Sequence, residues 1–107
     1  MQQDKTTYTV DFENAHNYFE IHDALKSGLD FPEYYGANLD ALYDCLTEMI
    51  DNDSIIILKN FQNAEKASED YANKILKVFH NAKHYADDLF PDSQIIVEKS
   101  GERTVLP

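Results

Sequence analysis

Alternation of apolar and polar residues predicts three strands. Residues 7–12, TYTVDF, alternate with a two-residue period, as in a strand that packs against the core on one side. Residues 55–58, IIIL, form an unbroken apolar run, which is typical of a strand covered on both faces in the middle of a parallel sheet. Residues 94–99, QIIVEK, give a third strand.

Between these strands, apolar residues recur at helical spacing. The segments concerned are residues 17–29, 38–51 and 68–89, and the polar stretch at residues 60–67 is a candidate for a further, short helix. Asn38 and Ser68 are good N-cap residues for the two longer helices. Strands separated by helices favour parallel pairing through right-handed crossovers. We therefore predict an α/β fold with a small three-stranded parallel sheet packed with about four helices.

Length and composition are those of a single domain. The 107 residues, 43% of them hydrophobic, suit one core over residues 1–107, with residues 100–107 as a loose C-terminal tail. Without a membrane-spanning apolar run or a signal segment in MQQDKTTYTV, we expect a cytoplasmic protein that does not bind membranes. The lone Cys45 falls in an apolar helical pattern, which predicts a buried, reduced thiol.

The charge balance narrows the class of partner. Twenty acidic and nine basic residues give a net charge of −11, which opposes binding to nucleic acid and favours a basic partner. No glycine-rich phosphate loop follows any predicted strand, so a nucleotide-binding fold is not supported. Many soluble proteins are acidic for solubility alone, so the net charge does not by itself indicate a basic partner. The positions of the acidic residues must distinguish a binding surface from a merely soluble one.

Acids gather on one side of the helix predicted over residues 38–51. At about 100° per residue, Asp44, Glu48 and Asp51 lie within about 80° of Asp40, and the leucines lie opposite. Each pair of like charges four residues apart costs ~0.2–0.5 kcal/mol, and no lysine or arginine relieves the repulsion. Two interpretations remain open on these grounds: a surface that binds a cationic partner, and a solvated helix face.

The segment FPEYYGANLDALYDCLTEMI, residues 31–50, resembles the signature of the barstar family, small intracellular inhibitors of secreted ribonucleases of the barnase kind. Similarity extends from about Ile21 to Lys83. The resemblance implies three parallel strands with packed helices, no enzymatic activity and no cofactor. It also implies a function: the aromatic loop and the acidic helix plug the basic active site of a ribonuclease, with carboxylates in the places of substrate phosphates.

The family pattern also implies a partner-binding set, in which Asp44 matches the dominant charged anchor. Glu48 joins this set from the acidic side of the helix, and Met49 from a position where the family's namesake has tryptophan. The full predicted set is Tyr34, Asn38, Leu39, Asp40, Tyr43, Asp44, Glu48 and Met49.

Departures from the family pattern leave the partner open. Tyr43 stands where the namesake has tryptophan, and Asn81 and Tyr85 stand where its long helix has glutamates. The expected partner of a chain that is monomeric when free is therefore a secreted ribonuclease of the barnase type or another basic toxin. The alternative is an immunity protein or acidic binding module for a different basic protein.

Histidines supply the remaining candidate chemistry. His80 and His84 lie four residues apart on one predicted helix, a spacing that metal ligands use, but no third ligand is evident. We therefore predict surface histidines and no metal site. His22 has no activated nucleophile beside it, so it is interpreted as a structural or solvent-facing residue, and no catalytic residue is predicted.

Overall fold

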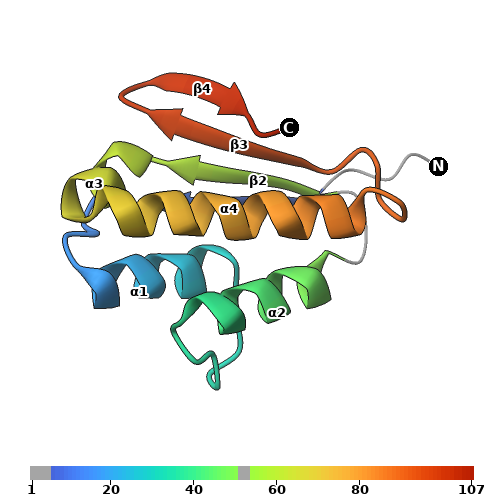
Figure 1. Ribbon diagram of the computed structural model, residues 1–107, viewed down its shortest axis with the longest axis horizontal. Helices are drawn as coiled ribbons and strands as arrows, with labels where there is room; N and C mark the ends of the chain where they lie inside the picture. Colours follow the sequence, from blue (N-terminus) through green and yellow to red (C-terminus); the bar gives the residue numbers. More distant parts are fainter. Residues whose placement is uncertain (1–5, 51–53) are drawn as a thin grey trace.

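The computed structural model describes residues 6–50 and 54–107 and shows an α/β fold with a four-stranded mixed sheet (Figure 1). The strands are β1 (Thr6–Asp11), β2 (Ser54–Lys59), β3 (Gln94–Lys99) and β4 (Glu102–Val105). They are ordered β1-β2-β3-β4, with the first three parallel and β4 antiparallel to β3. The predicted α/β class is confirmed, with one strand more than expected.

Helices fill both connections between the parallel strands. They are α1 (Tyr18–Gly28), α2 (Leu39–Met49), α3 (Phe61–Ala67) and α4 (Glu69–Ala86). Asn38 and Ser68 cap α2 and α4 as predicted, because each side-chain oxygen accepts a hydrogen bond from a backbone N–H in the first turn. Helix α4 ends at Ala86, so Leu89 lies beyond it and is 70% exposed. Asp51, expected at the end of α2, lies outside the described residues.

Only one face of the sheet is fully covered. Ile56 and Leu58 of β2 are buried, whereas Ile55 and Ile57, which point the other way, are only partly buried. The prediction that residues 55–58 are covered on both faces is therefore wrong. The strand order explains this, because successive right-handed crossovers from β1 to β2 and from β2 to β3 advance in one direction and place their helices on one face.

The predicted loose tail over residues 100–107 is wrong for the part that forms β4. Ser100 and Gly101 both have positive φ, at 49° and 87°, which suits a two-residue turn between antiparallel strands. The Leu106 N–H then donates to the Ile95 carbonyl oxygen at 2.8 Å and ties down the end of the segment. Because every residue of β4 is exposed, the strand shows no apolar alternation, and the Ser-Gly pair is its one signal in the sequence.

Helix α1 ends in close contact with β1. A Cβ atom on Gly28 would lie 2.6 Å from the Thr9 carbonyl oxygen and 2.7 Å from the Val10 Cα. Both are backbone atoms, which cannot move aside as a flexible side chain can. Glycine at this position therefore sets the distance between α1 and the sheet, and with it the start of the loop that leads to α2.

We expect Gly28→Ala to lower the free energy of unfolding by ~1–3 kcal/mol, because the added methyl group overpacks the contact between α1 and β1. Urea denaturation measures the change. Gly36→Ala is the matched control, since its nearest atoms would be at 3.4 Å, an ordinary contact. Equal stability of the two variants would contradict the role of Gly28.

Candidate protein-binding site

Helix α2 separates an acidic side from an apolar side. Leu42, Cys45 and Leu46 are buried and face the core, where α2 packs against α4. The exposed side carries what we call the acid row, Asp40, Asp44 and Glu48. With the helix held by its buried side, these carboxylates all reach solvent, as the helical spacing predicts.

Within the described part of the chain, no cation pairs with the acid row. Among the residues that the structure describes, no ion pair includes a member of the row. Asp40 lies in the first turn of α2, where the positive end of the helix dipole favours an acid. Asp44 and Glu48 lie further along, and α2 has no basic residue in its last turn. The row is therefore an uncompensated negative surface.

The loop between α1 and α2 exposes one tyrosine and partly buries the next. Tyr34 is 79% exposed, whereas Tyr35 packs its ring against the buried Phe31 at 4.8 Å between centroids. Tyr34 also lines a surface hollow of about 310 Å³ together with Glu48 and Met49. The structure thus brings together three of the predicted site residues from the loop and from the far end of α2.

The other predicted residues are engaged with the protein itself. Leu39, Tyr43 and Met49 are partly buried and pack against the core, so each offers only part of its side chain to a partner. The Asn38 Oδ1 accepts a hydrogen bond from the Ala41 N–H at 2.8 Å, and its Nδ2 donates to the Gly36 carbonyl oxygen at 3.3 Å. Asn38 therefore first serves to join the loop to α2.

A buried histidine of α1 supports this loop from the inside of the protein. His22 on α1 is 2% exposed, and its ring nitrogens lie 2.6 Å from the hydroxyl oxygens of Tyr35 and Tyr71. Burial lowers the pKa of His22, with a smaller opposing effect of the Asp23 charge. The sequence left open whether His22 is structural or solvent-facing, and the structure places it inside.

Tyr18, which is not among the predicted site residues, connects α1 to the same loop. Its hydroxyl donates to the Ala37 carbonyl oxygen at 2.5 Å, one residue before the N-cap of α2. The four-residue spacing of Tyr18 and His22 is the signal that could have indicated a shared face of α1. Burial raises the pKa of Tyr35 and of Tyr71, so both phenols stay protonated at neutral pH.

Neither the thiol nor the histidine pair adds chemistry to this surface. Burial, followed by the charges of Glu48 and Asp44, raises the pKa of the Cys45 thiol and disfavours the reactive thiolate. The rings of His80 and His84 lie edge to face, 4.4 Å apart between centroids. Within residues 6–50 and 54–107, no three potential ligands gather as a metal site would require. No helix in these ranges is long and apolar enough to cross a membrane.

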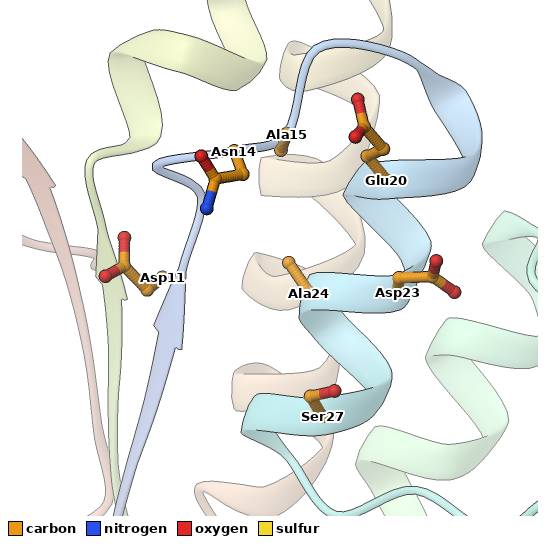
Figure 2. Close-up of a pocket in the computed structure, with 7 residues that line it drawn as sticks. All are labelled: Asp11, Asn14, Ala15, Glu20, Asp23, Ala24 and Ser27. Atoms are coloured by element: carbon orange, nitrogen blue, oxygen red, sulfur yellow. The ribbon is translucent and has the colours of Figure 1, made fainter.

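A second acidic hollow, of about 330 Å³, lies between the end of β1 and α1 (Figure 2). Its acids serve local structure: the Asp11 Oδ1 accepts hydrogen bonds from the Glu13 N–H and from Asn60 Nδ2, and Glu20 accepts one from the His16 N–H. In Figure 2 the carboxylates of Asp11 and Asp23 point away from each other. This hollow therefore lacks the convergent carboxylates of a binding site.

Comparison with known proteins assigns the family. A family model described as "Barstar (barnase inhibitor)" matches residues 6–98. The chain belongs to the barstar family. A Bacillus subtilis protein named "Putative ribonuclease inhibitor YrdF" is similar to it, with 44% identity over 88 residues, which are 82% of this chain and 90% of that protein. The barstar model spans the loop and α2, which carry the acid row, whereas β4 follows its end.

Because Asp44 lies four residues from both Asp40 and Glu48, Asp44→Asn removes two repulsive pairs, and we expect it to raise the free energy of unfolding by ~0.4–1 kcal/mol, or ~0.2–0.5 kcal/mol for each pair. The gain should shrink as salt screens the repulsion. Urea denaturation at low and high ionic strength measures both effects. Asp70→Asn is the control of opposite sign, because Asp70 pairs with Lys74 on α4 at 3.0 Å. A loss of stability in Asp44→Asn would show that the carboxylate is compensated within the fold.

Proposed function

We propose that this member of the barstar family is a protein inhibitor of a ribonuclease. The acid row and the aromatic loop would plug the basic active site of the enzyme, and the inhibitor itself would carry out no chemistry. The observation that carries this proposal is the exposed, uncompensated row of carboxylates on a helix whose other side is buried. The family description and the name of the Bacillus subtilis relative support the class of partner.

Occlusion follows from the charges on the two surfaces. A ribonuclease binds a polyanion, so its active site needs basic groups that hold phosphates. Carboxylates placed at phosphate positions can accept charge-assisted hydrogen bonds from the same groups. Because α2 is capped by Asn38 and held by its buried leucines, little freedom is lost when the row enters the site.

The predicted residues divide into charged and aromatic contacts. We assign Asp44 as the main anchor, with Asp40 and Glu48 on either side along the helix. Tyr34 would pack at the edge of the active site, because it is the most exposed ring of the loop. Tyr43, Met49 and Leu39 would add apolar contact through their exposed parts, and Asn38 would hold the loop in place.

For the partner, we propose a secreted ribonuclease of the barnase type, bound by a chain that is monomeric when free and acts in the cytoplasm. A different basic toxin is the second candidate. It is favoured by α4, where Asn81 and the 60% exposed Tyr85 stand in place of the glutamates of the family's namesake. Assay of the purified chain against ribonucleases encoded beside it distinguishes the two.

We expect Asp44→Ala to weaken inhibition more than any other substitution in the row, because it leaves cations of the enzyme buried and unpaired. The loss should reach at least ~30-fold in the inhibition constant, the equivalent of ~2 kcal/mol. Asp40→Ala and Tyr34→Ala should follow with smaller losses. Titration of RNA cleavage with each variant measures the ranking.

Glu69→Ala is the control for this ranking. It removes the same charge from α4, and the first turn of that helix, next to α3, lies away from α2 (Figure 1). Inhibition by Asp44→Ala equal to that by Glu69→Ala would exclude the acid row as the contact surface.

Association should also depend strongly on salt. A chain of net charge −11 and a basic enzyme attract each other over ~30 Å at 0.01 M salt but over only ~8 Å at 0.15 M. We therefore expect the association rate constant to fall by about tenfold or more across this range, as stopped-flow mixing would show. Tyr34→Ala removes no charge and should keep the same salt dependence. A rate independent of salt would contradict electrostatic steering.

A further inference from the structure

The surface hollow of about 310 Å³ beside Tyr34 lies where α1 and α2 both end, and we call it the end hollow. Buried apolar side chains form its floor, among them Leu29 and Phe31. The exposed residues Asp30 and Glu48 also line it, and Glu48 is the last member of the acid row. The end hollow therefore combines an apolar floor with two carboxylates from different segments of the chain.

The thiol of Cys45 is the polar group of this floor. Cys45 lines the hollow and is 9% exposed, and its thiol makes no hydrogen bond with the residues that the structure describes. Burial, followed by the charges of Glu48 and Asp44, raises the pKa of the thiol, so the floor is uncharged at neutral pH. Such a floor can cover the methylene groups of a long side chain, and its sulfur is a weak acceptor for an N–H group.

Asp30 occupies a position at which helices usually have glycine. It follows Leu29, the C-cap of α1, and its φ of 54° is in the left-handed region. The Phe31 N–H donates to the Lys26 carbonyl oxygen at 3.0 Å, which is the hydrogen bond of a Schellman motif. The left-handed conformation favours glycine, and the negative end of the helix dipole disfavours an acid. The fold of α1 therefore does not explain a carboxylate here.

Glu48 is also unfavourably placed for its own helix. It lies in the last turn of α2, which has no basic residue. In Figure 1, α1 and α2 run in the same direction, so the negative ends of both helix dipoles lie on the same side of the molecule. Lys26, in the last turn of α1, pairs with Glu33 at 3.4 Å and does not line the end hollow.

The two carboxylates of the end hollow have no partner within the described ranges, residues 6–50 and 54–107. No hydrogen bond or ion pair there involves the side chain of Asp30 or of Glu48. Both charges and both helix dipoles thus favour a cation at this place, and the fold supplies none.

The lining of the end hollow suits the side chain of an arginine. Its methylene groups match the apolar floor, and its charge matches the two carboxylates. Tyr34, which is exposed and lines the hollow, offers an aromatic face on which a planar guanidinium stacks. A lysine ammonium is more strongly hydrated and cannot stack in this way. An apolar side chain would cover the floor but leave both acids without a partner.

We propose that the end hollow is a docking site for an arginine side chain of the inhibited ribonuclease, at the rim of the enzyme's active site. The choice of a ribonuclease as the source of this arginine rests on the function proposed above. Glu48 joins the hollow to the acid row, so an enzyme held by the row has its rim beside the hollow. Asp30, which lies outside the row, becomes a residue that contacts the partner, and the hollow selects enzymes with an arginine at this place.

Asp30→Asn separates binding from stability. Asparagine suits the left-handed position after a helix and carries no charge at the negative end of the dipole, so this variant should have a higher midpoint of urea denaturation than wild type. A loss of binding in the more stable protein cannot result from unfolding. A lower midpoint would show that the carboxylate supports the fold and would overturn its assignment to binding.

The first binding test uses the free protein and needs no nuclease. N-acetyl-arginine amide should shift the amide NMR signals of Leu29, Asp30 and Met49 in a saturable way, with a dissociation constant of ~1–10 mM. Asp30→Asn and Glu48→Gln should each weaken this binding about two- to fivefold. Asp23→Asn is the matched control, because it removes an exposed charge of α1 that does not line the end hollow.

Two further probes test the chemistry of the occupant. N-acetyl-citrulline amide has the shape of the arginine probe without its charge, and N-acetyl-lysine amide has the charge without the planar group. Both should bind more weakly than N-acetyl-arginine amide. Shifts that do not saturate, equal binding of either probe, or equal losses in Asp30→Asn and Asp23→Asn would overturn the proposal.

The second binding test uses a barnase-type ribonuclease that the chain inhibits, at about 0.15 M salt, where long-range attraction is screened. Asp30→Asn should weaken inhibition about two- to fivefold, and Asp23→Asn should match wild type. Each arginine of the enzyme is then changed in turn to glutamine. For one of these enzyme variants, wild type and Asp30→Asn should inhibit equally, because the contact is already lost. A difference that persists with every enzyme variant would overturn the proposal.

The two proposals fail in different ways. If the chain inhibits no ribonuclease, the function proposed above is wrong, while the NMR titration still decides whether the end hollow binds a guanidinium group. If Asp44→Ala loses inhibition but Asp30→Asn inhibits as well as wild type, the acid row stands as the inhibitory surface and the docking site alone is rejected.

Discussion

Burial of one side of α2 is the constraint on which the surface of this protein depends. Each leucine removed from water contributes ~1.5–3 kcal/mol, whereas repulsion between neighbouring acids costs only ~0.2–0.5 kcal/mol. Burial of Leu42 and Leu46 therefore sets the rotation of the helix about its axis. The acids then all lie on the exposed side, although they repel one another. The free energy cost of this charge arrangement is small in the free protein. The arrangement becomes favourable when a cationic surface approaches, which suits a binding surface.

The loop before α2 adds a second fixed element to the same surface. Its inward rings, Phe31 and Tyr35, pack against each other, and Asn38 closes it onto the helix. Tyr34 is the ring left outside. Because the loop is attached at both ends, it can present an aromatic side chain without the entropy loss that a mobile loop would incur on binding.

Local patterns predicted most of this architecture, and long-range contacts account for what they missed. Helix caps and apolar spacing are encoded within a few residues, so Asn38 and the acid row were readable from the sequence, although the roles within the row came from resemblance to the barstar family. An apolar run such as residues 55–58 does not reveal how many of its faces are covered, because that depends on the direction of the crossovers. The partners of His22 lie 13 and 49 residues away, beyond any local period.

The short strand β4 has a consequence for how the protein behaves at high concentration. Without it, β3 would end the sheet and offer a row of unpaired backbone groups to another copy of the chain. β4 pairs with β3 and satisfies these backbone groups. The edge of the sheet is then a four-residue strand that carries Glu102 and Arg103. Short, charged edges resist strand-to-strand aggregation. The hairpin formed by β3 and β4 therefore lowers the tendency of the protein to aggregate in concentrated solution.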